Sequence, residues 1–167
     1  IKRMQPEGLK SQKRGGKGLI GMATKEEDVV SQFFMANTHD SLLFFTNSGK
    51  VFQTKGYEVP ESSRQSKGKA IVNFLQISPN ELITAVVPIP KDQKGGYLFM
   101  ATANGVIKKV DADSFSQVRS NGILAIKLRS NDELGWVLST SGNDQVMLVT
   151  SGGNAIRFKE KDVRPMG

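Results

Sequence analysis

The chain has 167 residues, a length that allows one domain with a substantial core. It carries 23 Lys and Arg against 16 Asp and Glu, and this surplus favours a polyanionic partner, either nucleic acid or an acidic membrane surface. No apolar run approaches the roughly 20 residues of a membrane span, and the start does not resemble a secretory signal. Cysteine is absent, which excludes disulfides and thiolate metal sites and fits a reducing, cytoplasmic setting.

In chain order, three segments repeat one pattern: an apolar run, a short Ser/Thr/Asn/Gly turn, and a second run that contains cations. They span residues 42–52, 97–109 and 146–158, and each is typical of a β-hairpin. The turn glycines Gly49, Gly105 and Gly153 are spaced by 105 − 49 = 56 and 153 − 105 = 48 residues. A period near 50 residues with four short strands per repeat predicts an all-β fold of propeller-like blades.

We therefore divide the chain into four units: a partial blade over 1–36, blades over 41–89 and 96–140, and the start of a fourth blade over 145–167. The first residue, Ile1, lies inside an expected strand and is not Met, so we expect a fragment of a longer protein. The expected strands are 1–4, one after Gly18, and 29–36 in unit one; 42–46, 50–54, 71–75 and 82–87 in unit two; 97–102, 106–110, 123–128 and 136–139 in unit three; and 146–150 and 154–158 in unit four.

Unit one contains a basic, glycine-rich stretch, Gln12-Lys13-Arg14-Gly15-Gly16-Lys17-Gly18, which we call the box. Glycine permits turns that aim successive N–H groups at one anion, and Arg and Lys neutralise its charge. A solvated basic turn is the simpler alternative. The box occupies a fixed place in the repeat, because Ile1 precedes Gly16 by 15 residues, as Ile107 precedes Gly122.

Basic residues recur at two places in the units. The strand cations, expected on equivalent second strands, are Lys2, Arg3, Lys108, Lys109, Arg157 and Lys159. The loop cations, expected on equivalent loops, are Lys13, Arg14, Lys17, Arg64, Lys67, Lys69 and Arg119. Recurrence in each blade would line them along one rim, and cations at regular intervals suit a surface that bends duplex DNA.

Other constellations favour simpler interpretations. The segment 16–21 reads G-x-G-x-x-G with Asp40 nineteen residues later, but no βαβ unit surrounds it, so a dinucleotide site is not expected. The single histidine, His39, lacks neighbouring ligands and is interpreted as a surface residue. Tyr57 and Tyr97 lie in no motif typical of a DNA-cleaving tyrosine. Apolar strand positions predict core roles for Tyr97, Trp136, Phe33, Phe34, Phe44, Phe45 and Phe74.

All seven box positions match Q-(K/R)-R-G-G-(K/R)-G, and the chain resembles the C-terminal DNA-wrapping domains of the gyrase A family. Segments that carry the resemblance further include 43–49, 71–73, 119–123 and 162–167. The resemblance implies a six-bladed β-pinwheel, here incomplete, with duplex DNA on its basic rim. It adds Gln12, Gly15, Gly16 and Gly18 to the cations as DNA-binding residues.

The resemblance also implies a non-catalytic module of DNA gyrase, an ATP-dependent type II topoisomerase that introduces negative supercoils. ATP would be bound by the gyrase B protein and Mg²⁺ would serve cleavage elsewhere, so no cofactor is expected in this stretch. The implied partners are double-stranded DNA, a dimer of gyrase A chains, and gyrase B, in the nucleoid of the cytoplasm. Two alternatives remain: the topoisomerase IV domain, whose box is degenerate, and a propeller that binds protein partners through a mixed or apolar rim.

Overall fold

The computed structural model describes residues 1–6, 14, 16, 22–24, 29–63 and 65–167. The strands among these residues are β1 (Ser41–Thr46), β2 (Lys50–Lys55), β3 (Ile83–Ile89), β4 (Tyr97–Thr102), β5 (Ile107–Asp111), β6 (Ile123–Leu124), β7 (Leu134–Thr140), β8 (Gln145–Val149) and β9 (Ala155–Lys159). Short 3-10 turns follow several strands: η2 (Gly56–Glu58), η3 (Ile71–Asn73), η4 (Ala112–Phe115) and η5 (Glu160–Asp162). The described part of the chain contains no α-helix, which confirms the all-β prediction.

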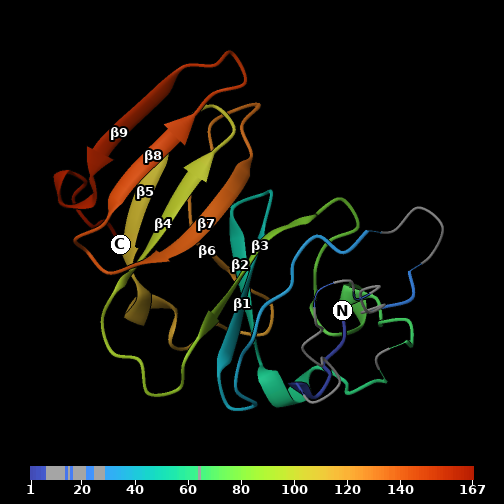
Figure 1. Cartoon of the computed structure of the whole chain (residues 1–167). Helices are drawn as coiled ribbons and strands as arrows, with labels where there is room; N and C mark the ends of the chain where they lie inside the picture. Colours follow the sequence, from blue (N-terminus) through green and yellow to red (C-terminus); the bar gives the residue numbers. More distant parts are fainter. Residues whose placement is uncertain (7–13, 15, 17–21, 25–28, 64) are drawn as a thin grey trace.

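The strands form two sheets and a hairpin, all antiparallel (Figure 1). The first sheet has the order β3-β1-β2-β6, the second β5-β4-β7, and β8 pairs with β9. The central strands β1 and β4 are almost wholly buried, as their consecutive apolar residues predict for strands covered on both faces. The repeat of the sequence is therefore a repeat of structure, and the propeller-like class is confirmed.

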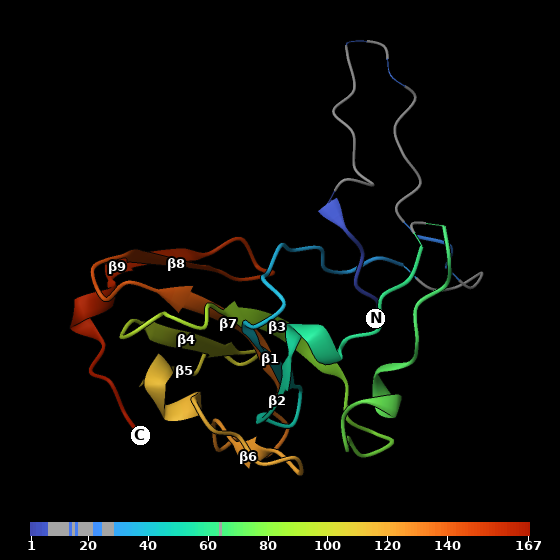
Figure 2. The ribbon, with the colours of Figure 1, turned by 90° about the horizontal axis from the view of Figure 1, so that it is seen from below.

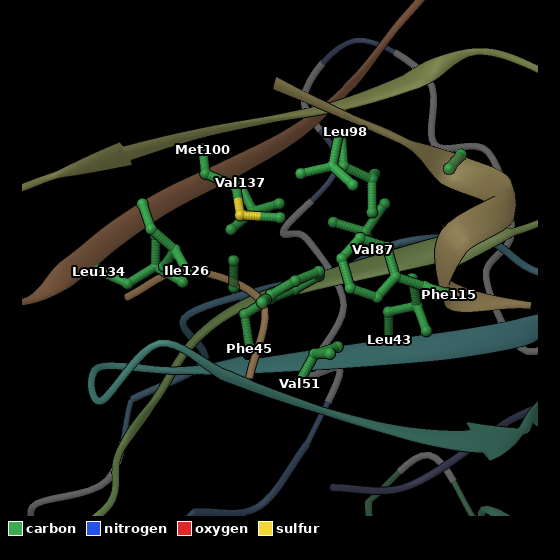
Figure 3. Packing of buried hydrophobic residues seen from close by; sticks show 14 residues of the cluster. Leu43, Phe45, Val51, Val87, Leu98, Met100, Phe115, Ile126, Leu134 and Val137 are labelled. Atoms are coloured by element: carbon green, nitrogen blue, oxygen red, sulfur yellow. The ribbon is translucent and has the colours of Figure 1, made fainter. Parts of the chain in front are cut away.

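The main core lies between the two sheets (Figure 3). Leu43, Phe45 and Val87 from the first sheet meet Leu98 and Val137 from the second, and all are buried. The ring of Phe45 meets that of Phe115 from η4 edge to face, with centroids 6.0 Å apart. A second cluster covers the opposite face of the first sheet, with the buried residues Leu42, Phe44, Phe52, Val59 and Leu75.

Successive units are joined by shared structure. Strand β6 belongs by sequence to unit three, yet it pairs with β2 of unit two, Ile123 opposite Val51. The backbone N–H groups of Ala125 and Ile126 then donate to the Gly49 carbonyl, at 2.9 and 3.1 Å. The four-stranded sheet is thus built from two repeats, and neither repeat completes it alone.

Several predicted strands were wrong. Residues 71–75 begin with the 3-10 turn η3, and 123–128 shorten to β6. In unit three the segment after β6 donates to the Gly49 carbonyl, whereas the N–H groups of residues 73–75 donate to the carbonyls of Ala70 and Ile71 within the 3-10 turn. Among residues 1–4 only Arg3 forms an isolated bridge, and residues 29–36 form no strand. The strand expected after Gly18 begins outside the described residues.

Three predicted core residues are exposed. Trp136 is 61% exposed and Phe33 68%, and Phe34 is partly exposed at 38%. Trp136 on β7 lies opposite Ala101 on β4, and Ala85 on β3 lies in the same way opposite Phe45 on β1. In unit two that face packs in the main core against the second sheet and the Ala125–Ile126 segment, whereas Trp136 belongs to neither buried cluster of the described residues. The core roles of Phe44 and Phe45 are confirmed, Phe74 packs against the second cluster, and Tyr97 is partly buried.

Candidate nucleic-acid interface

The candidate interface is built on the segment of each unit that returns to the unit before it. We call residues 61–70 of unit two and 117–126 of unit three the return loops. The return loop of unit two pairs with unit one: the N–H of Lys69 donates to the Ile1 carbonyl at 2.8 Å, and the Ile1 amino group donates to the Lys69 carbonyl at 2.7 Å. The return loop of unit three pairs with β2 in the same way, through β6.

A glycine lies where each return loop touches the preceding strand. Gly122 has a φ of +74°, and a Cβ added there would come within 2.8 Å of the Phe52 ring. A Cβ on Gly68, its counterpart, would come within 2.8 Å of the Ile1 carbonyl oxygen. Only glycine permits so close an approach, so the backbone of each return loop lies directly against the strand. Gly16 of the box is the counterpart in unit one.

The described loop cations are exposed. These residues are Arg14, Lys67, Lys69 and Arg119, and Gly16 of the box is exposed as well. The other box residues and Arg64 lie outside the described residues, namely Gln12, Lys13, Gly15, Lys17, Gly18 and Arg64. Figure 2 shows the return loop of unit two on the side of the N-terminus and that of unit three around β6.

Most strand cations, in contrast, bind protein groups. Lys2 Nζ donates to the carbonyls of Ser63 and Ser66, both at 3.0 Å, and desolvation lowers the pKa of Lys2. Lys108 Nζ donates to the Ala125 carbonyl at 2.9 Å. These ammonium groups therefore hold return-loop carbonyls rather than standing free for a phosphate.

Arg3 and Lys109 are bound more completely. Arg3 Nη1 lies 3.0 Å from Glu61 Oε2, and its Nε donates to the Val59 carbonyl at 3.2 Å. Lys109 is only 3% exposed, and its Nζ donates to the Glu160 carbonyl at 3.1 Å and lies 4.6 Å from the Tyr97 ring centroid. The burial of Lys109 contradicts its predicted place on an exposed rim. The remaining strand cations, Arg157 and Lys159, are exposed on β9.

The carboxylate that faces Lys109 was missed by sequence reasoning. Glu160 is fully buried and accepts hydrogen bonds from Gly142 N at 2.8 Å, Asp144 N at 3.2 Å and Thr140 Oγ1 at 2.7 Å. Gln53 was missed too, although it occupies in unit two the repeat position of Arg3 and Lys109. Gln53 carries no charge, so the recurrence of cations in the repeat does not include it.

Among the described residues there is no group of three or more His, Asp or Glu side chains that could hold a metal ion, and no helix has the length and apolarity to span a membrane. His39 is exposed, as predicted, and its ring meets Tyr57 at a centroid distance of 5.9 Å.

Successive units of antiparallel strands that exchange segments define a propeller-type repeat domain. A family described as "DNA gyrase C-terminal domain, beta-propeller" matches residues 1–37, 40–90, 96–141 and 144–167, and the chain belongs to this family.

Two curated relatives are both the A chain of DNA gyrase. The one from Clostridium acetobutylicum is 45% identical and the one from Halalkalibacterium halodurans 47% identical, each over 100% of this chain. In both cases the chain spans 20% of the length of the relative.

Solved structures are similar as well. A DNA gyrase A C-terminal domain matches with a TM-score of 0.76 and 26% identity, over 99% of this chain and 53% of that one. The C-terminal domain of DNA topoisomerase IV matches with a TM-score of 0.78 and 30% identity, over 88% of this chain and 46% of that one. The two enzymes share the fold, so the assignment to gyrase depends on the sequence relatives and the family match.

Proposed function

We propose that this chain binds duplex DNA through its exposed loop cations and wraps it, as the DNA-wrapping part of a gyrase A protein. The observation that carries the proposal is the division of the cations. The described loop cations are exposed at equivalent places on successive units, whereas Lys2, Arg3, Lys108 and Lys109 bind protein groups. Exposed cations at regular intervals suit the phosphates of a bent duplex.

In the whole enzyme, wrapping would return a DNA segment to the cleavage domain with a defined handedness, so that strand passage introduces negative supercoils. ATP would be bound by gyrase B and Mg²⁺ used in the cleavage domain, in a complex that contains a dimer of gyrase A. This chain would contribute no catalytic residue and no cofactor. Relatives that are gyrase A proteins support this role, and a protein with this role would act in the cytoplasm, at the nucleoid.

The proposed contacts fall into two groups. Those on described, exposed residues are Arg14, Gly16, Lys67, Lys69, Arg119, Arg157 and Lys159. Those on residues of the sequence outside the described part are Gln12, Lys13, Gly15, Lys17, Gly18 and Arg64. Lys2, Arg3, Lys108 and Lys109 are left out, because their charged groups bind protein carbonyls.

Binding is expected to depend strongly on salt and only weakly on base sequence. The motivating features are the formal net charge of +7 and the absence of any α-helix among the described residues that could enter a major groove. Each neutralised phosphate contributes about −0.9 to the slope of log K against log salt concentration. The measurement is DNA affinity over a salt series on duplexes of unrelated sequence and different length. A flat salt response, or strong preference for one sequence, would contradict the proposal.

Alanine at Lys67 or Arg119 is expected to weaken binding about equally on all sequences. The salt slope should fall by about one unit for each cation removed, and Arg64→Ala is expected to behave alike. Lys94→Ala, at an exposed cation in the 90–96 turn, is the matched control and should leave affinity unchanged. Altered stability with intact DNA affinity would show that the return-loop cations serve folding alone.

Two alternatives are less well supported. A protein-binding propeller predicts a mixed or apolar loop surface, but the exposed side chains of the return loops include Lys67, Lys69 and Arg119. A topoisomerase IV domain predicts a degenerate box, but this box is intact at all seven positions.

A further inference from the structure

One position in the repeat makes the same kind of contact in three successive units. The position lies on the second strand of each unit, two residues after Ile1, Val51 or Ile107. It is occupied by Arg3 in unit one, Gln53 in unit two and Lys109 in unit three. We call these three residues the latch residues. Each donates a side-chain N–H to a backbone carbonyl of the following unit, at or beside that unit's 3-10 turn.

Arg3 binds the segment of unit two that runs from η2 into the return loop. Besides its contacts with Val59 and Glu61, its backbone N–H donates to the Pro60 carbonyl at 2.9 Å, and its carbonyl accepts from Ser62 N at 3.0 Å. The result is a parallel bridge between Arg3 and Glu61. The side chain and the backbone of Arg3 therefore hold the same short stretch.

Gln53 binds unit three at the corresponding place. Its Nε2 donates to the Phe115 carbonyl at 3.3 Å, at the end of η4, and its Oε1 accepts from Val118 N at 3.1 Å. Val118 immediately precedes the exposed Arg119. The amide of Gln53 thus fixes the backbone from which that loop cation projects.

Lys109 binds unit four. Its carbonyl accepts from Met166 N at 2.8 Å, and a parallel bridge joins it to Pro165, the counterpart of Glu61. Its ammonium donates to the Glu160 carbonyl and lies 3.9 Å from Glu160 Oε1. Guanidinium, amide and ammonium thus fill one position, so the feature they share is an N–H donor of suitable reach and not a positive charge.

We propose that Arg3, Gln53 and Lys109 are positioning residues, which fasten the returning segment of the following unit and so determine where its loop cations stand. The effect of the latch residues on DNA binding rests on the proposed function, but their hydrogen bonds to the following unit do not. Direct phosphate binding is less favoured, because each latch side chain already donates to a protein carbonyl and Lys109 is buried.

The test is Gln53→Leu in the intact gyrase A protein, because this substitution removes the donor without changing the net charge. Hydrogen exchange of the Val118 amide is expected to accelerate at least about tenfold, since its acceptor is lost. DNA affinity should fall several-fold. In an Arg119→Ala background the same substitution should have little further effect on affinity, because the cation that it positions is already gone.

Two variants sharpen the test. Gln53→Lys keeps a donor for the Phe115 carbonyl, as Lys109 does in unit three, so it should retain DNA affinity, whereas Val118 loses its acceptor and should exchange faster, as in Gln53→Leu. Gln76→Leu makes the same change at an exposed glutamine and should alter neither.

Several results would overturn the proposal. Unchanged exchange at Val118 would show that Gln53 fastens nothing, and an undiminished loss of affinity in the Arg119→Ala background would make it a direct DNA contact. If Gln53→Leu also accelerates exchange throughout β4, the test is repeated in unit one with Arg3→Leu. Hydrogen exchange is then measured at the Ser62 amide, and DNA affinity in a Lys67→Ala background. General unfolding of that variant as well would make the latch residues folding determinants only. If the unaltered protein shows no salt-dependent DNA binding, the proposed function fails, while exchange at Val118 still decides the fastening.

Discussion

Alanine at Lys13, Arg14 and Lys17 together in the intact enzyme is expected to abolish negative supercoiling, while ATP-driven relaxation and decatenation survive. The box carries three cations and three glycines in seven residues, whereas the return loop of unit two carries three cations and one glycine in ten residues and that of unit three one cation and one glycine in ten. Bending a short stiff duplex costs on the order of 1–6 kcal/mol, and contacts along the protein must offset that cost. Loss of one strong contact point would therefore open the wrap without touching the cleavage and strand-passage domains.

The measurement is a plasmid topology assay on relaxed, supercoiled and catenated substrates. Lys94→Ala, which removes a charge at an exposed turn, serves as the control. Retained supercoiling would show that the box is only a solvated turn. Loss of all three activities would assign the box to folding or to the cleavage machinery.

Phe45→Ala is expected to destabilise the chain by about 3–5 kcal/mol, the usual cost of truncating a buried aromatic side chain. Phe45 is fully buried, faces Phe115 across the boundary between units two and three, and lies opposite Val51 and Ala85 in the first sheet. Its removal would leave a cavity between two sheets rather than inside one. Both units should therefore lose stability together.

Denaturant unfolding of the purified chain measures this effect. Tyr57→Ala is the matched control, since Tyr57 is 54% exposed and contacts only the exposed His39 ring among the described aromatic pairs. That substitution should change the free energy of unfolding by no more than about 0.5–1 kcal/mol. An equally small effect of Phe45→Ala would mean that the two sheets do not share a packed core.

The sequence predicted the hairpins well, because their signals are local. The runs at 42–46, 97–102 and 146–150, with a glycine in each turn, became β1, β4 and β8 within one residue at each end. The burial of Phe44 and Phe45 followed from consecutive apolar residues in a strand covered on both faces.

The sequence did not predict which unit each later strand would join. Ile123 has the same local pattern whether it pairs within unit three or with Val51 of unit two, and only the tertiary structure decides. The errors at Trp136 and Lys109 have the same origin. The exposure of Trp136 and the burial of Lys109 both depend on whether the next unit covers them, and residue type and spacing carry no information on that.

The exchange of β6 also has a consequence for protein synthesis. Strand β2 ends at Lys55 and β6 ends at Leu124, so 124 − 55 = 69 residues must be added before β2 gains its neighbour. At about 5–20 residues per second, β2 waits on the order of 3–14 s with one edge open. Open edges recruit other strands, and lysines on the edge discourage this. Lys50 and Lys55 at the two ends of β2 would therefore protect the nascent chain from aggregation on the ribosome until the following blade emerges.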